Sequence, residues 1–412
     1  MPHFRELRPL TVGRVAGTLA RASALAIVAM SLTGQMAQSQ TYTLYAPGDG
    51  AKPEAGVTIR GQLVYGTTTA GGTGDGGLVF EATHVGDLYN FMGALTSPLS
   101  RVVFGPDDHL YGTTPGSGSN NPGFVYDLIP NPTICKVVTC QPWKATLLYE
   151  FSGYPDGAHP GYGDLIWDQR GNIYGTTTIG GTKEFGVVYE MMPPVPPSKT
   201  WTESVIWNFT GPDGENPQNA VVFDANGHLL GTAKLGGANG LGTVFKLTPS
   251  GNTWTETNVY DFQGGSDGQY PIAGLTLDSS GNIYGATSDG GSGGGGTVFE
   301  LIPSGNSYTF KLLYGFSGQQ GMNCGSWGTL AMDAAGSLYG TTYCDGVNGL
   351  GNIFKLTNTQ NGWTFTSLHD FPAFNGDGIW PISNVTFDAQ GNLWGTASAG
   401  HQGTGAVWMI KP

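Results

Sequence analysis

One sequence unit occurs seven times along the chain. Its core reads Asp-x-x-Gly-Asn-Ile-Tyr-Gly-x-Thr, followed by a Gly-rich stretch and then by Gly-x-Val-Phe-x-Leu. The Gly of this core falls at intervals of 46 to 63 residues, at Gly66, Gly112, Gly175, Gly231, Gly285, Gly340 and Gly395. Repetition at this period is typical of solenoids, propellers and arrays, so most recurring residues are expected to serve the architecture.

The clearest copy of the unit predicts four strands, at residues 273–278, 282–287, 297–302 and 308–316. Asp278 and Gly281 predict a type I turn after the first strand, because Asp caps backbone amides and Gly accepts the left-handed conformation. Four antiparallel strands in a unit of about 55 residues indicate a propeller blade. Helical repeats are excluded, since no segment beyond the N-terminal region keeps a 3.6-residue period.

The two ends of the repeat region complement each other. The last copy stops at Pro412, after its third strand, and residues 41–46 look like a fourth strand without a blade. We therefore predict an all-β fold, a seven-bladed β-propeller of four-stranded antiparallel blades. The N-terminal strand closes the ring by pairing with the last blade, which removes exposed sheet edges. The Gly inside each second strand is expected to mark the close approach of a neighbouring blade or an aromatic ring.

The first 39 residues have the pattern of a signal peptide. A basic region with Arg5 and Arg21 is followed by a short apolar run at 22–32, and Ala37-Gln38-Ser39 offers a cleavage site. An N-terminal amphipathic helix is the alternative. Residues 40–412 are then a single exported domain, secreted or periplasmic, because no later apolar run could span a membrane.

Charge and cysteine content narrow the class of protein further. The net charge is −13, and removal of residues 1–39 makes it about −16, which argues against nucleic acid as a partner. Four cysteines in an exported chain suggest two local disulfides, Cys135 with Cys140 and Cys324 with Cys344. Neither pair has the spacing of a metal site. We expect a monomer.

A combination of motifs resembles a known family. Phe-Ser-Gly, Asp-Gly-x-x-Pro, the Asn-Ile-Tyr-Gly-Thr-Thr core and Gly-Thr-Val-Phe-Lys-Leu follow one another in residues 151–189, 209–247 and 262–301. This order is similar to the GloVer-type tandem repeat of exported bacterial proteins. The resemblance implies a β-propeller of the cell surface or exterior without an assigned activity, often joined to a C-terminal sorting anchor. The chain ends inside its last blade, which favours a free protein over an anchored one.

One face of the predicted propeller carries the candidate site. In each blade, the entering loop and the loop between the second and third strands lie on this face, which we call the loop face. Five entering loops contain Asp-Gly-x-x-Pro. The ligand-binding candidates on this face are Asp156, His159, Asp213, Glu215, Asp267, Tyr270, Asp377 and Trp380.

Two interpretations of these residues remain open. The Asp residues either cap turns or bind a polar ligand or a cation such as Ca²⁺, although no cofactor is firmly implied. Trp380, Tyr270 and His159 either stack against a sugar or peptide or pack between blades. Insertions at 130–143 and at the Pro-rich segment 192–198 are expected on the opposite face, as surface decoration or as a partner contact.

Three functions fit these features, and the first is favoured. It is a binding module that holds a glycan or a protein on the loop face. The second is a metal-dependent hydrolase, lactonase or lyase at the channel mouth, for which Asp156, Asp213 and Glu215 would be essential. The third is a structural component of the cell envelope. Catalytic motifs are weak, because Gly290-Gly-Ser-Gly-Gly294 lacks the strand–turn–helix context of a nucleophile elbow.

Overall fold

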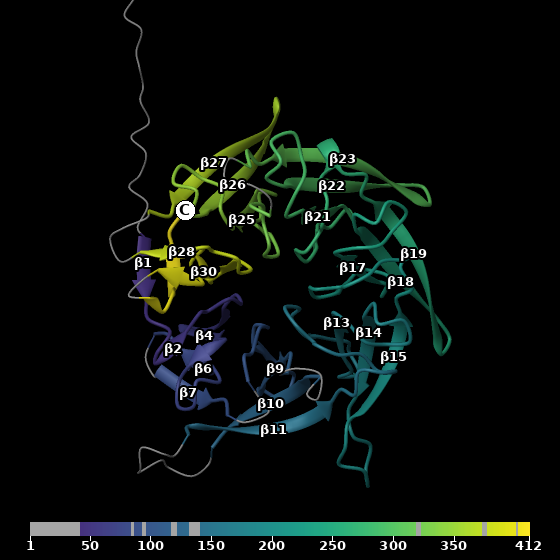
Figure 1. The fold of residues 1–412 in the computed structure, drawn as a ribbon, viewed down its shortest axis with the longest axis vertical. Helices are drawn as coiled ribbons and strands as arrows, with labels where there is room; N and C mark the ends of the chain where they lie inside the picture. The colour runs from purple at the N-terminus through teal and green to yellow at the C-terminus, as the bar shows by residue number, and fades with distance from the viewer. Residues whose placement is uncertain are drawn as a thin grey trace, which may run out of the picture. The chain divides into compact units, whose positions relative to one another are not determined.

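A computed structural model describes residues 42–83, 86–92, 96–116, 122–131, 141–318, 323–372, 377–400 and 403–412. The predicted signal peptide, residues 1–39, lies outside this part of the chain. Residues 40–412 form one compact unit. Seven antiparallel sheets of four strands each stand around a common axis, which confirms the predicted seven-bladed propeller (Figure 1).

The blades follow one another in chain order, each with its innermost strand first. Blade 1 has β3 (Thr58–Arg60), β4 (Leu63–Thr68), β6 (Leu78–Glu81) and β7 (Gly86–Asn90). Blade 2 has β8 (Val103–Phe104), β9 (Leu110–Thr114), β10 (Phe124–Pro130) and β11 (Trp143–Glu150). Blade 3 has β12 (Ile166–Trp167), β13 (Ile173–Thr177), β14 (Val187–Met192) and β15 (Thr202–Asn208). Blade 4 has β16 (Val222–Phe223), β17 (Leu229–Ala233), β18 (Thr243–Ser250) and β19 (Thr253–Asp261).

The remaining blades keep the same order. Blade 5 has β20 (Thr276–Leu277), β21 (Ile283–Ala286), β22 (Thr297–Ser304) and β23 (Ser307–Gly315). Blade 6 has β24 (Ala331–Met332), β25 (Leu338–Thr342), β26 (Asn352–Thr359) and β27 (Gly362–Asp370). Blade 7 has β29 (Thr386–Phe387), β30 (Leu393–Ala397), β32 (Ala406–Ile410) and β1 (Tyr42–Tyr45).

The N-terminal strand closes the ring as predicted. β1 pairs antiparallel with β32, with Tyr42 opposite Ile410, and the purple strand lies beside the yellow blade in Figure 1. The Tyr42 ring also stacks on His369 of blade 6, with 3.9 Å between ring centroids. The closing strand therefore ties blade 7 to its neighbour as well as completing its own sheet.

The repeated glycines lie against aromatic rings, one of the two neighbours expected for them. A Cβ atom at Gly231 would come within 3 Å of the Phe245 ring, and one at Gly395 within 3 Å of the Trp408 ring. Both rings belong to the third strand of the same blade and are fully buried. The glycine thus makes room for a large, fully buried ring, and that ring fills the layer between adjacent blades.

The ends of the strands differ from the sequence prediction. The innermost strand of blade 5 is only β20, two residues long, where six were expected. The residues before it contact other blades instead of a ladder partner: the Ala273 carbonyl accepts a hydrogen bond from Thr232, and Gly274 lies against Thr329. The outer hairpin is longer than expected, because Pro303 still pairs with Tyr308.

The loop face forms as predicted. Backbone bridges join the entering loop to the loop between the second and third strands, pairing Ala158 with Ile179, Glu215 with Leu235 and Gln269 with Asp289. In blades 1 and 7 the same bridge is a short two-stranded sheet, made by β2 (Gly50–Ala51) with β5 (Ala70–Gly71) and by β28 (Gly378–Ile379) with β31 (Ala399–Gly400). A short 3-10 helix, η1 (Gly265–Asp267), lies in the entering loop of blade 5. We call the opposite side, with the Asp-x-x-Gly turns and outer hairpins, the turn face.

Candidate functional site

The predicted Asp residues are bound by their own loops. In blades 3, 4 and 5 each carboxylate accepts one hydrogen bond from a loop amide and one from an aromatic side chain on the outermost strand of the preceding blade. The amide donors are Ser152 to Asp156 (3.0 Å), Thr210 to Asp213 (2.7 Å) and Gln263 to Asp267 (2.9 Å). The aromatic donors are Tyr149 to Asp156 (2.6 Å), Trp207 to Asp213 (3.0 Å) and Tyr260 to Asp267 (2.8 Å). These carboxylates therefore fasten each entering loop to the blade before it.

Asp377 has the same role at the ring closure. It accepts hydrogen bonds from its neighbour Gly378 (2.7 Å) and from the Tyr42 hydroxyl (2.6 Å), and it bonds His369 Nε2 at 2.9 Å. Burial alone would raise the pKa of Asp377, but the hydrogen bonds from His369 and Tyr42 outweigh it and lower that pKa. Within the described residues, no group of three or more His, Cys, Asp or Glu side chains is placed to hold a metal ion.

His159, Tyr270 and Trp380 occupy one position of the repeat, directly before Pro. All three have left-handed backbone conformations, with φ values of 55°, 58° and 58°. Their amides bind carbonyls of the preceding blade, as when Tyr270 donates to Leu241 (2.9 Å) and Trp380 to Leu350 (2.9 Å). The architecture uses the backbone at this position, so the side chain is free to differ from blade to blade.

Trp380 is the predicted residue that joins an aromatic cluster. The Tyr343 ring lies 5.9 Å from that of Trp380 and 5.3 Å from that of Trp327, measured between centroids. Trp380 is 37% exposed, and the other two rings are partly exposed. We call Trp327, Tyr343 and Trp380 the aromatic platform. It spans blades 6 and 7 on the loop face.

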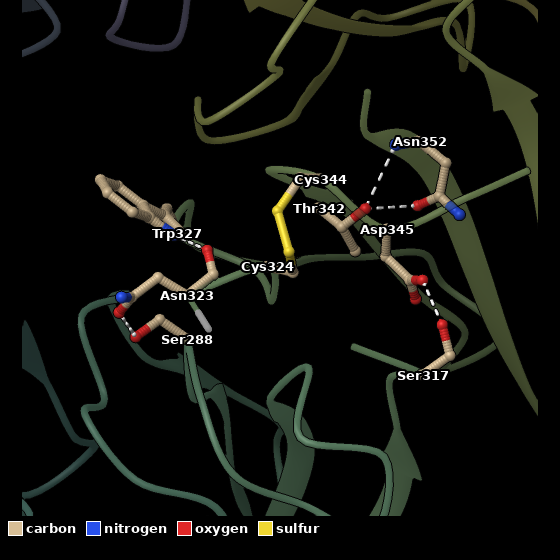
Figure 2. Close-up of a disulfide and its surroundings, with 9 residues drawn as sticks. All are labelled: Ser288, Ser317, Asn323, Cys324, Trp327, Thr342, Cys344, Asp345 and Asn352. Atoms are coloured by element: carbon tan, nitrogen blue, oxygen red, sulfur yellow. Dashed lines mark hydrogen bonds between the residues drawn. A yellow bond between two sulfur atoms is a disulfide. The ribbon is translucent and has the colours of Figure 1, made fainter. Parts of the chain in front are cut away.

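A disulfide holds the blade 6 part of this platform. Cys324 and Cys344 are bonded, as predicted, with a Cα–Cα distance of 4.6 Å. Cys344 directly follows Tyr343, and the carbonyl of Asn323, the residue before Cys324, accepts a 3.1 Å hydrogen bond from Trp327 Nε1 (Figure 2). The disulfide thus links the two segments that carry Trp327 and Tyr343. The other predicted pair, Cys135 and Cys140, lies outside the described residues.

The aromatic platform borders a cavity on the propeller axis. All seven blades contribute one residue shortly after the entering loop to its wall: Glu54, Leu99, Tyr162, Gln218, Ile272, Trp327 and Ile382. The cavity volume is about 30 Å³, which is room for roughly one or two water molecules. A sugar ring or a side chain of a partner would therefore rest at the mouth and not within the cavity.

An ion pair crosses the wall of the cavity. Arg101 of blade 2 donates to Asp164 of blade 3 at 2.6 Å, and Asn384 of blade 7 donates to the same Asp164 oxygen at 3.1 Å. Arg101 also donates to Thr386 Oγ1 of blade 7 at 3.1 Å. Arg101 Nε and Asp164 Oδ1 are buried and have no hydrogen-bond partner among the described residues. Buried polar atoms of this kind are uncommon in folded proteins.

Glu54 and Tyr162 are titratable groups of the cavity wall, and the pKa of each is raised. Burial raises the pKa of Glu54, and the nearby charge of Lys52 opposes this only in part. Burial and the charge of Glu54 together raise the pKa of Tyr162. Neither residue was among the predicted candidates, and the same is true of Arg101, Asp164 and Trp327. The signal was present, because large or charged side chains replace the small or aliphatic residues that other copies carry after the entering loop.

Sequence comparison places the chain in a family. A model of the Gloeobacter/Verrucomicrobia repeat matches residues 21–203, 137–309 and 256–412. The chain belongs to this repeat family. The matches run through all seven blades, as the GloVer-type resemblance implied. No curated protein sequence is similar to the chain.

Solved structures share the fold of this repeat protein at low identity. An ancestral GH74 enzyme is 13% identical with a TM-score of 0.57, and 88% of this chain covers 48% of it. An extracellular domain described as part of a hybrid two-component system of B. thetaiotaomicron is 12% identical with a TM-score of 0.51. In that comparison 89% of this chain covers 39% of the domain, so the chain spans less than half of either protein. Within the described residues, no helix is long and apolar enough to cross a membrane.

Proposed function

We propose that this repeat protein is an exported binding module, secreted or periplasmic, that holds a carbohydrate on its loop face. The observation that carries the proposal is the aromatic platform of Trp327, Tyr343 and Trp380. Flat aromatic rings offer a large apolar contact area at low entropic cost, and they stack on the apolar faces of sugar rings. An exposed group of three such rings is otherwise costly on a soluble protein.

Polar groups beside the platform complete a carbohydrate site. Trp327 belongs to both the platform and the cavity wall, so Glu54, Tyr162 and Gln218 of that wall lie around the same mouth. They provide acceptors and donors for sugar hydroxyls, as a few fixed polar groups do in a mainly apolar site. The small volume of the cavity keeps the ligand on the surface, which suits one residue of a longer glycan chain.

Export is supported by chemistry as well as by the predicted signal peptide. The Cys324–Cys344 disulfide is the kind of bond that persists in oxidising compartments outside the cytoplasm. The described residues offer no particular observation for a metal-dependent hydrolase, lactonase or lyase, because Asp156 and Asp213 are engaged by their own loops. A single function is therefore proposed.

A glycan array followed by calorimetric titration tests the proposal. Trp380→Ala is expected to weaken binding of the strongest glycan by about tenfold or more, because it removes an exposed stacking surface. Tyr270→Ala is the matched control, since Tyr270 has the same repeat position and backbone conformation in blade 5. It is expected to leave the affinity unchanged.

Other outcomes would select the alternative functions. If no glycan on the array binds but a protein partner does, the ligand of the loop face is a protein and not a carbohydrate. Hydrolysis or elimination of a bound glycan would make the protein an enzyme. The absence of any saturable ligand would favour a structural component of the cell envelope.

A further inference from the structure

A long groove lies between blades 3 and 4 on the turn face, away from the aromatic platform. Its volume is about 930 Å³, at the upper end of the range for sites that hold small ligands. Aromatic residues from both blades line it: Trp167 and Tyr174 from blade 3, and Phe223 and Trp254 from blade 4. Trp254 reaches across the interface, and its ring lies 6.3 Å from that of Tyr174.

The Pro-rich connection of blade 3 explains why the groove is open here. In blade 4 the outer strands β18 and β19 continue to a tight turn, where Ser250 still pairs with Thr253. In blade 3, β14 ends at Met192 and β15 begins only at Thr202, so residues 193–201 leave the sheet. Met192 is 36% exposed and Val195 is 76% exposed. The hairpin of blade 4 is thus left without a matching hairpin on its blade 3 side, where the groove lies.

The groove extends along the outer wall of the propeller. A second cavity of about 410 Å³ shares Glu190, Ser204, Asn252 and Trp254 with the first. It continues along the edge strand β15 from Ser204 to Asn208. β15 itself contacts β19 of blade 4. Because the two cavities share four residues, they form one groove along blades 3 and 4, which fits a chain-like ligand better than a compact one.

The charged groups of the groove are mainly carboxylates. Asp168 and Glu190 are both held by Asn172, at 3.0 Å and 2.7 Å, and Asp224 is held by His228 at 2.7 Å. Burial opposes ionisation of Asp224, but hydrogen bonds from His228 and Asn226 outweigh it and lower its pKa. Three carboxylates therefore face the groove with one guanidinium, that of Arg170. This excess of negative charge repels anionic chains. Asp168 and Asp224 also accept hydrogen bonds from backbone amides of their own turns, those of Asn172 and His228, at 2.9 Å each.

We propose that the groove between blades 3 and 4 binds a neutral oligosaccharide in an extended conformation. Trp254 and Trp167 supply stacking surfaces, Glu190 accepts hydrogen bonds from sugar hydroxyls, and Asn252 and Gln169 provide amide donors. This site is on a different face from the aromatic platform and does not depend on it. An extended cationic peptide is the competing occupant, and the test separates the two.

The experiment uses the whole mature protein in a Trp380→Ala background, which disables the platform. The probes are an array of neutral and acidic oligosaccharides printed beside lysine-rich peptides, and the strongest neutral hit is then titrated. Trp254→Ala is expected to weaken that hit by about tenfold or more. Trp363→Ala is the matched control, because Trp363 has the same repeat position in blade 6 and its ring lies 6.3 Å from that of Tyr284, outside the groove. It is expected to leave the affinity unchanged.

The remaining outcomes overturn the proposal. Binding of peptides or acidic glycans through Trp254 would assign the groove to another ligand. Equal losses in Trp254→Ala and Trp363→Ala, with lowered melting temperatures in both, would mean that the ring only stabilises the blade. If all glycan binding is lost in Trp380→Ala alone and none depends on Trp254, the platform stands as a carbohydrate site and the groove does not.

Discussion

Blades 5 and 6 close the same loop in different ways. In blade 5, Gln269 and Asp289 face each other across the backbone bridge, and Gln269 Nε2 donates to Asp289 at 3.0 Å. In blade 6 the same two positions are Cys324 and Cys344, joined covalently. The residue before the first of each pair has a positive φ in both blades, 91° at Gly268 and 62° at Asn323. The propeller therefore requires a closed pair of loops at this point, and the chemistry of closure is free to change.

The disulfide, which is the stronger of these two links, lies at the candidate binding site. Blade 6 lacks the Asp-Gly-x-x-Pro turn of blade 5, yet it carries Trp327 and Tyr343 of the aromatic platform. A binding surface gains affinity when its residues are held in place before the ligand arrives. We infer that the disulfide replaces the lost Asp cap and also keeps the two rings in position.

Removal of the disulfide is expected to have the largest effect. The bond closes a segment with a sequence separation of 20 residues, so Cys324→Ser with Cys344→Ser should lower the free energy of unfolding by about 2–4 kcal/mol. Affinity for the platform glycan should fall as well, because Trp327 and Tyr343 lose their common anchor. Chemical denaturation and glycan titration measure the two effects.

A second variant shows whether the platform needs the covalent bond or only some contact between the two loops of blade 6. Cys324→Gln with Cys344→Asp copies blade 5 and should recover part of the affinity without the covalent bond, since the pair can form a hydrogen bond. If the Ser variant unfolds at the same denaturant concentration as the wild type, the disulfide does not stabilise blade 6. If the Gln/Asp variant binds no better than the Ser variant, only the covalent bond positions the platform.

The Asp cap of blade 5 is expected to contribute somewhat less. Asp267 is 9% exposed, and Asp267→Ala would leave Tyr260 Oη and the Gln263 amide without an acceptor. The expected loss is about 1–3 kcal/mol in the free energy of unfolding. Asp267→Asn keeps one acceptor oxygen and should lose less, which calorimetric melting can resolve.

Addition of Ca²⁺ tests whether the Asp267 carboxylate binds a cation or only caps its loop. If Asp267 serves only to cap its loop, millimolar Ca²⁺ should leave the melting temperature of the wild-type protein unchanged. A melting temperature that rises with Ca²⁺ in the wild type, and not in Asp267→Ala, would show that the carboxylate binds the ion. That result would restore the cation-binding interpretation of the repeated Asp residues.

The repeat made the fold predictable, and departures from it made the sites difficult to find. Seven copies and two complementary chain ends were sufficient for the blade number, the ring closure and the pairing of Cys324 with Cys344. Arg101 and Asp164 meet beside the axis from two adjacent blades, which a single copy of the unit cannot show. The groove depends on a missing hairpin in blade 3 and on Trp254 from blade 4, so its residues come together only in the assembled ring.

Blades 4 and 5 also differ in the side chain that the outermost strand packs against the preceding blade, and this difference predicts a pH dependence. In blades 5 and 6, Phe310 and Phe365 stack on Tyr260 and Tyr314 of the preceding blade, with centroid distances of 4.7 Å and 4.4 Å. The equivalent position in blade 4 is Glu256. Glu256 pairs with Leu247 of the third strand, as Phe310 pairs with Leu301 in blade 5. Burial, and then the charges of Asp213 and Asp261, raise the pKa of Glu256 to about 7. Blade 4 thus has a carboxyl group where blade 5 has an apolar ring.

Replacement of this carboxyl group is expected to stabilise the protein at alkaline pH. The pKa of Glu256 is about 7 in the folded protein, whereas an unperturbed glutamate has a pKa of 4.5, so the folded protein retains a proton that the unfolded chain releases between these values. Stability therefore decreases as the pH rises through this window. Glu256→Gln should gain about 1 kcal/mol at pH 8, a value reduced for partial exposure, and nothing at pH 4. Melting temperatures across this range should show the difference, with exposed Glu184→Gln as the control; an equal gain at both pH values would mean that the charge of Glu256 is not the cause.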